Sequence, residues 1–337
     1  MCPNIFFLGF SGVVRFGDLR IAGLSGIWKS GDYRRPYTAG PPYNHPGDIR
    51  SAYHIREFDV FKLSQLRQPL DVFISHDWPQ GVASFGDMEQ LFRAKPFLRQ
   101  EVLDGSLGSQ PGAQLLAQLA PDYWFSAHLH VRFPALIPRS GSRAGHTRFL
   151  ALDKCLPGRN FLQVVDIPDR SAGPITWDEE WLAIVKATHH AMPVRHHPPP
   201  LPRVPPGGAS VAEPHIAAVR DALQRASSSV VGATAAFTPT VQAHDPRQAR
   251  SRRGAPPSHT PRNPQTLALL DLLQLEYVLD GQAHMLPPPP PLPQQPTAAV
   301  PNAEEVDLPI DGEEDATTGG GGGAGELLEL PDEDELE

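Results

Sequence analysis

The chain has 337 residues, which is enough for two ordinary domains, but 39 of them are prolines, so we expect one compact domain with appendages. Residues 301–337 hold 14 of the 38 acidic residues and none of the 29 basic ones, which leaves the preceding part of the chain at about +5 and suited to an anionic partner. Two cysteines exclude a disulfide framework, and the absence of a long apolar run or signal peptide indicates an intracellular protein without membrane contact.

Apolar runs recur from residue 5 to about residue 167 at the density of a folded domain. Short runs bounded by glycine indicate strands, and apolar residues spaced three or four apart indicate helices. Because predicted strands alternate with predicted helices, this part of the chain is typical of an α/β fold. In chain order we predict strands at residues 5–8, 13–14 and 19–24, a helix at 55–66, a strand at 70–74, a helix ending at 115–119, and strands at 123–126, 148–152 and 161–165.

The rest of the chain forms a weaker helical unit followed by low-complexity sequence. Asn263 precedes Pro264 in an arrangement typical of a helix cap and first turn. Proline runs predict stiff spacers, and the acidic tail is predicted to be disordered from its composition. We predict a first domain at residues 1–170, a small helical C-terminal domain at 171–284 with helices at 177–187, 215–226 and 264–279, and a disordered tail at 285–337.

Three histidines follow two of the predicted strands. His76 comes directly after the strand at 70–74, and His128 and His130 come after the strand at 123–126. A histidine beyond a strand can present a neutral imidazole to a metal at the rim of a sheet. If the extended path continues past the second strand, alternation would point His128 and His130 the same way.

The alternative to metal binding, for any one of these histidines, is a hydrogen-bonded surface or core residue, which is the commoner role. Their recurrence after two separate strands favours metal binding. Three imidazoles do not complete a two-metal hydrolytic site, because such a site also needs anionic ligands to bridge the ions. Asp77 and Trp78 are interpreted as residues that orient or pack against His76, and Cys155 as a buried filler.

Two motifs, Ser-His-Asp-Trp-Pro at 75–79 and Tyr-Trp-Phe-Ser-Ala-His-Leu-His at 123–130, resemble the lariat debranching enzymes, a branch of the calcineurin-like metallophosphoesterase superfamily. The family's Gly-His-x-His motif has Ala127 in place of glycine. The resemblance covers residues 3–190 well and residues 210–282 loosely. Further segments that resemble this family are residues 24–34, 41–44, 49–54, 97–102, 177–184 and 263–266.

This resemblance implies a partial metallophosphoesterase β-sandwich flanked by helices, with a divalent metal (Fe, Zn or Mn) held by His76, His128 and His130. It also implies a nuclear enzyme that hydrolyses the 2′-5′ phosphodiester of branched intron lariat RNA, with splicing-related proteins as partners. Family members open with further ligand motifs and a catalytic histidine that have no counterpart here, so we expect an N-terminally truncated chain. We therefore assign no catalytic residue and expect little activity from this chain alone.

Residues 28–61 concentrate aromatic and basic side chains, including four of the six tyrosines. Aromatic rings stack on unpaired bases and guanidinium groups pair with phosphates, so this composition suits irregular RNA. The alternative is an extended loop whose aromatics pack on the domain. In the family that the chain resembles, this segment corresponds to the lariat recognition loop. The predicted RNA-binding residues are Trp28, Lys29, Tyr33, Arg34, Tyr43 and Tyr53.

Two functions of different kinds remain open. The first is metal-dependent debranching of lariat RNA, and the second is a non-catalytic form that binds RNA or splicing factors without cleaving. A general metallophosphatase fits less well, because the loop and the C-terminal helices resemble the debranching branch. His189-His190 and His196-His197 adjoin proline-rich sequence and are interpreted as parts of a solvated linker.

Overall fold

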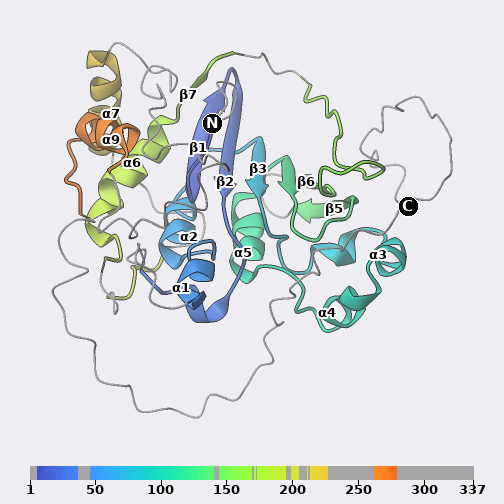
Figure 1. The fold of residues 1–337 in the computed structure, drawn as a ribbon. Coiled ribbons are helices and arrows are strands. Elements are labelled where there is room, and N and C mark those ends of the chain that lie inside the picture. The colour runs from blue at the N-terminus through green and yellow to red at the C-terminus, as the bar shows by residue number, and fades with distance from the viewer. Residues whose placement is uncertain are drawn as a thin grey trace, which may run out of the picture.

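The protein is an α/β structure built on one large sheet (Figure 1). The α/β prediction is confirmed, and none of the helices in the described part of the chain is long and apolar enough to cross a membrane. The predicted tail at 285–337 lies outside the described residues. The computed structural model describes residues 6–36, 46–139, 144–168, 171, 173–194, 199–204, 211, 213–226 and 262–278.

The sheet has seven strands in the order β5-β6-β4-β3-β2-β1-β7. The four strands β2, β3, β4 and β6 run parallel, β1 and β5 flank them antiparallel, and β7 pairs antiparallel with β1. The described strands all belong to this single sheet, so the second layer of a sandwich is not found among them. The strands are β1 (Ser11–Phe16), β2 (Leu19–Leu24), β3 (Val72–Ser75), β4 (Tyr123–Ser126), β5 (Phe133–Arg139), β6 (Gly145–Ala151) and β7 (Ile175–Trp177).

Helices α2 (Glu57–Leu63) and α5 (Gln110–Leu119) pack beside each other against the sheet. The core between the helices and the sheet includes Phe73 and Trp124, whose stacked rings are 4.0 Å apart and fully buried. Burying two rings of this size is worth several kcal/mol relative to leaving them exposed, so this contact is a main support of β3 and β4. Ser109 begins α5 by accepting a hydrogen bond from the Gly112 backbone.

Smaller elements fill the two long connections of the sheet. Between β2 and α2 lie η1 (Ser30–Asp32) and α1 (Pro46–Ser51). Between β3 and α5 lie η2 (Val82–Phe85), α3 (Met88–Ala94), η3 (Pro96–Leu98) and α4 (Arg99–Leu103). Gly86, just after η2, forms a β-bridge with Ala135 of β5, which holds this second group of elements beside the β5 edge.

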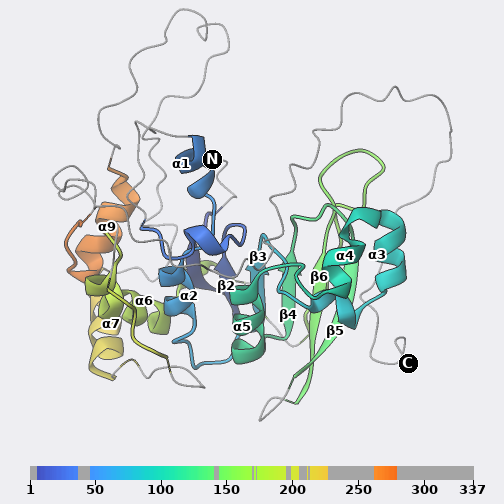
Figure 2. The same cartoon turned by 90° about the horizontal axis from the view of Figure 1, so that it is seen from below.

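The C-terminal helices gather at the end opposite α3 and α4 (Figure 2), beside β1 and β7 (Figure 1). They are α6 (Glu179–Thr188), η4 (His189–Ala191), α7 (Glu213–Arg225) and α9 (Pro264–Leu273). Asn263 caps α9 as predicted, by accepting from the Gln265 backbone, and Asp178 caps α6 by accepting from Trp181. The predicted helix at 177–187 is shifted, because Trp177 pairs with Val14 in the sheet.

A buried ion cluster joins these helices to the sheet. Arg20 of β2 donates two hydrogen bonds of 2.8 Å to the two carboxylate oxygens of Asp178 and one of 2.7 Å to Glu180. The side chain of Asp178 has no exposed surface, and those of Arg20 and Glu180 have 3 % and 7 %. Glu180 also accepts from the backbone of Arg67 and Gln68, so the cluster fixes three segments at once.

Two predicted strands are wrong. The described part of the run at 5–8 is not a strand, because β1 already pairs with β2 on one side and β7 on the other. The run at 161–165 is also irregular: it lies in the long connection from β6 to β7 and pairs with no strand of the sheet. Its side chains Phe161, Leu162 and Val164 are consequently exposed. The predicted helix at 55–66 is confirmed in part and is shorter, because it begins at Glu57 and ends at Leu63.

Candidate functional site

The predicted histidines lie at the carboxyl edge of the sheet. His76 follows β3 and His128 follows β4, and these two strands are parallel neighbours. Their rings meet, with centroids 5.0 Å apart. His130 is close enough to influence both rings electrostatically. The structure therefore brings together histidines that are 52 residues apart in sequence, as the parallel arrangement of the strands requires.

Buried hydrogen bonds tie the two strand ends together. The Ala127 backbone donates to the His76 carbonyl at 3.0 Å, and the Trp78 indole donates to the Ala127 carbonyl at 2.9 Å. Below them, the hydroxyls of Ser75 and Ser126 are 2.8 Å apart. These bonds fix the positions of the two histidine-bearing turns relative to each other, so the contact between the rings does not depend on the rings alone.

The chain beyond β4 does not continue as a strand, so the expectation of simple alternation there is wrong. His128 and His130 have φ values of 62° and 51°, and the Leu129 backbone donates to the Ala127 carbonyl at 2.8 Å. Left-handed conformations at residues other than glycine cost on the order of 1 kcal/mol each and persist where surrounding packing holds them. Buried Leu129 and Val131 supply that packing here.

The electrostatic surroundings keep the imidazoles neutral. Burial lowers the pKa of His76 and the adjacent His128 lowers it further, while burial and His130 lower the pKa of His128. Burial also lowers the pKa of His130, and the positive charges of Lys154, Lys95 and Arg159 add to this effect against the opposing charge of Asp153. A neutral imidazole is the form that binds a metal or accepts a hydrogen bond.

These donors suit a transition metal in type but do not complete a site. Two adjacent neutral imidazoles are good ligands for Zn, Fe or Mn. Among the residues that the structure describes, however, no group of three His, Cys, Asp or Glu side chains is placed to hold a metal ion. The nearby carboxylate of Asp77 is used otherwise. Binding of a metal by His76, His128 and His130 therefore stays a prediction.

Asp77 connects the histidine edge to the aromatic segment. Its buried carboxylate accepts a hydrogen bond of 2.9 Å from the backbone of Trp28, which comes shortly after β2. Burial raises the pKa of Asp77 to about 6, despite the opposing effect of the backbone bonds from Trp28 and Trp78. Asp77 thus anchors, beside His76, the start of the segment at 28–56, which is the part of residues 28–61 that precedes α2.

The predicted RNA-binding residues divide into two groups. Trp28 and Tyr33 are half-buried, pack edge to face with ring centroids 5.0 Å apart, and rest on the core. Tyr53 is 41 % exposed, and the Arg34 side chain is 82 % exposed beside Glu57. Lys29 is partly exposed. Packing thus accounts for part of the aromatic content, while Arg34 and Tyr53 face solvent; Tyr43 lies outside the described residues.

A buried polar cluster inside this segment was not predicted. The His54 ring lies 2.6 Å from the Asp32 carboxylate, and the buried Arg56 guanidinium donates to the Asp32 and Ser51 carbonyls. Burial raises the pKa of Asp32, but the hydrogen bonds from His54 and Arg35 outweigh it, and the net pKa is lowered. No spacing in the sequence signals a contact between residues 22 apart across an irregular segment.

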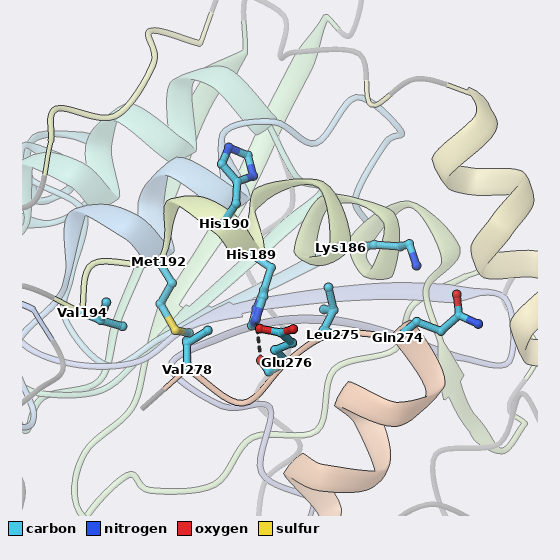
Figure 3. Close-up of a pocket in the computed structure, with 9 residues that line it drawn as sticks. All are labelled: Lys186, His189, His190, Met192, Val194, Gln274, Leu275, Glu276 and Val278. Carbon is cyan, nitrogen blue, oxygen red and sulfur yellow. Dashed lines mark hydrogen bonds between the residues drawn. The ribbon is translucent and has the colours of Figure 1, made fainter. Parts of the chain in front are cut away.

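Two other interpretations need correction. Cys155 is exposed, not buried, because it lies in the loop after β6. His189 belongs to η4 and not to a linker, and its ring contacts the Glu276 carbonyl at 2.8 Å at a cavity of about 390 Å³ (Figure 3). Lys186, beside the same cavity, donates to the Leu273 carbonyl at the end of α9. The pair at 196–197 lies outside the described residues.

Comparison with known proteins gives consistent matches. Residues 144–278 match the family model of the lariat debranching enzyme C-terminal domain, so this model includes β6 as well as the C-terminal helices. The chain is 45 % identical over 280 residues to a lariat debranching enzyme of Arabidopsis thaliana, which covers 82 % of the chain and 63 % of that protein.

The chain belongs to the lariat debranching enzyme family. The Danio rerio enzyme is 42 % identical over 294 residues, which is 84 % of the chain and 50 % of that protein. The Homo sapiens enzyme is 50 % identical over 194 residues, which is 56 % of the chain and 36 % of that protein. The chain thus spans between about a third and two thirds of the length of these family members.

Proposed function

We propose that this chain binds branched RNA and belongs to a metal-dependent hydrolase of the 2′-5′ phosphodiester at intron branch points, acting in the nucleus with splicing-related partners. Its relatives are named lariat debranching enzymes. The observation that carries the proposal is the pairing of His76 and His128 at the carboxyl edge of two parallel strands. The anchored segment at 28–56 starts beside this pair and offers exposed Arg34 and Tyr53.

In this proposal, His76, His128 and His130 contribute imidazoles to a divalent metal, which is Fe, Zn or Mn. Bound there, the metal would acidify water and neutralise charge on the phosphoryl oxygens. The chain's own residues position the RNA. Arg34 pairs with phosphate, Tyr53 stacks on an unpaired base, and Asp77 holds the segment that bears them next to His76.

Metal binding is tested by titrating the chain with cobalt(II), whose visible spectrum reports ligand type and geometry. We expect cobalt(II) to change the absorption spectrum. His76→Ala and His128→Ala should each lower the affinity for cobalt(II) at least tenfold. His190→Ala, which removes an exposed imidazole far from this edge, serves as the matched control and should leave the titration unchanged. An identical titration in all four proteins would contradict a metal role for these histidines.

Substrate binding is tested by fluorescence anisotropy with a short 2′-5′ branched RNA and its linear counterpart. We expect tighter binding of the branched RNA, and a loss of about tenfold when Arg34 and Tyr53 are both replaced by alanine. Each lost base stacking interaction is worth about 1–3 kcal/mol. Equal affinity for branched and linear RNA, or unchanged affinity of the double variant, would refute this part of the proposal.

A second candidate function is RNA binding without cleavage. It is favoured by Arg34 and Tyr53, which are exposed for contact with RNA whether or not a metal is bound. Under this alternative the anisotropy experiment succeeds while incubation of the branched RNA with the chain and Fe, Zn or Mn yields no linear product. Release of linear product that depends on His128 would instead establish the hydrolase.

A further inference from the structure

The carboxyl edge of the sheet places a second group of charges beside the histidines. Because β6, β4, β3 and β2 are parallel neighbours in that order, their following segments lie in the same order along one edge. The segment at 28–56 follows β2, the histidines follow β3 and β4, and residues 153–160 follow β6. Three strand spacings of about 4.8 Å separate β2 from β6, so the two outer segments leave the sheet roughly 14 Å apart, with the strands that precede the histidines between them.

The segment after β6 is a closed loop that presents cations. Its ends are joined by a hydrogen bond of 3.0 Å from the Asp153 backbone to the Asn160 carbonyl. Arg159 lies 3.6 Å from the Asp153 carboxylate with 42 % of its side chain exposed. Lys154 begins the loop, and the Leu152 backbone donates to the Ser126 carbonyl, so the loop leaves the sheet next to the turn that bears His128 and His130.

A third cation arrives from a different part of the chain. Lys95 follows α3, and the bridge between Gly86 and Ala135 holds the elements preceding it beside β5. Lys95, Lys154 and Arg159 each lower the pKa of His130 electrostatically, which agrees with this placement of their segments beside the histidines. Asp153 opposes them and lies beside Arg159, so among these four side chains three are cationic and one is acidic. Like charges brought together in this way repel one another and favour an anion at their centre.

From this placement we infer that Lys95, Lys154 and Arg159 form a phosphate-binding surface for an RNA strand that leaves the histidines on the β6 side. The inference rests on the proposed RNA-binding function and extends it, because the segment at 28–56 serves the opposite side. A branched RNA has more than one strand leaving its branch point. The exposed Arg34 and Tyr53 on one side of the histidines and the positive surface on the other would each accept one of these strands, whereas a single surface would hold a linear RNA equally well.

The test replaces all three cations by glutamine and measures binding of the branched RNA by anisotropy between 0.05 and 0.3 M salt. Each phosphate contact contributes about 0.7 to the slope of log K against log salt on single-stranded RNA, so we expect the slope to fall by about 2. The same relation predicts affinity about 100-fold weaker at 0.1 M salt. The matched control replaces Arg67, Arg203 and Arg225 by glutamine, which changes the net charge equally at exposed positions elsewhere.

The outcomes separate the inference from the function on which it rests. A weaker, less salt-dependent complex for the first variant and an unchanged complex for the control support the surface. Equal losses in both variants, or none in either, would overturn it while leaving RNA binding by the unsubstituted chain intact. Failure of the unsubstituted chain to bind RNA would remove the proposed function, and this inference with it.

A measurement without charge substitution guards against misfolding of the triple variant. Cys155 is exposed in the loop between Lys154 and Arg159. In a Cys2→Ser chain, we expect saturating branched RNA to slow the reaction of this thiol with a maleimide reagent at least fivefold. An unaltered rate at saturating RNA would show that no strand passes over this loop and would overturn the inference.

Discussion

The cluster of Arg20, Asp178 and Glu180 should determine whether the C-terminal helices remain attached to the sheet. Replacing Arg20 by methionine preserves most of the side-chain volume but leaves buried Glu180 without its cation and buried Asp178 with only the partly exposed Arg15, 3.3 Å away. Removing one partner of a buried ion pair typically costs about 3–5 kcal/mol, because the remaining charge stays desolvated. Since a domain of this size has a free energy of unfolding of about 5–15 kcal/mol, we expect a large loss of stability or separate unfolding of the helices.

The assay is urea denaturation followed by tryptophan fluorescence. Trp177 and Trp181 flank Asp178 and report on this junction. The matched control is Arg220→Met, which breaks an exposed ion pair of 3.0 Å between Arg220 of α7 and Glu179 at the start of α6. Exposed pairs contribute about 0–1 kcal/mol, so the control should remain close to the unsubstituted protein.

A triple variant completes the experiment. Arg20→Met with Asp178→Asn and Glu180→Gln removes all three charges, and it should recover part of the stability lost in the single variant, because no isolated buried charge remains. The reasoning would be refuted if Arg20→Met destabilised the protein no more than Arg220→Met does. It would also be refuted if the triple variant were less stable than the single one.

Three further predictions concern pH and the anchoring of the segment at 28–56. Burial raises the pKa of Asp178, but the hydrogen bond and charge of Arg20 lower it more, so the net pKa is lowered. The ionised carboxylate therefore contributes fully to stability above the unfolded pKa of about 4, and this contribution is lost as the pH falls below that value. Urea midpoints that stay constant between pH 5 and 2.5 would contradict this. Asp77→Asn should weaken the bond to the Trp28 backbone, cost about 1–3 kcal/mol and speed hydrogen exchange of that amide, and unchanged exchange would count against the anchor. Gly26→Ala should destabilise the same junction, because Gly26 has a φ of 108° and an added Cβ would lie 2.6 Å from the Tyr53 carbonyl oxygen; a urea midpoint equal to that of the unsubstituted protein would show that the junction adapts.

Local patterns predicted the strands that bear the histidines well. The run at 123–126 is β4 with the same bounds, and the run at 70–74 overlaps β3. A short run of aliphatic and aromatic residues bounded by polar turns is typical of a buried strand. The contact between His76 and His128 followed from the expectation that both strands share a sheet. The left-handed turn at 127–130 could not be predicted, since it depends on tertiary bonds such as that from Trp78 to Ala127.

Tertiary pairing decided the elements that sequence analysis placed wrongly. The run at 161–165 has the composition of a strand, yet it pairs with no strand of the sheet, because strand composition does not ensure a pairing partner in the folded chain. The grouping of Lys95 with Lys154 and Arg159 was equally invisible, because it depends on the bridge between Gly86 and Ala135 and on the order of parallel strands. Charges that converge from separate segments have no signature in linear spacing.

The irregular segment after β6 has a practical consequence for handling the protein. Phe161, Leu162 and Val164 leave apolar surface facing water, with Leu162 77 % exposed. Association of the protein through such apolar surface strengthens as kosmotropic salt is added. Complexes held by contacts between basic side chains and phosphates instead dissociate as the salt concentration rises. Light scattering in rising ammonium sulfate should therefore distinguish self-association of the chain from its binding to nucleic acid. Binding curves measured at low protein concentration should be less affected by self-association.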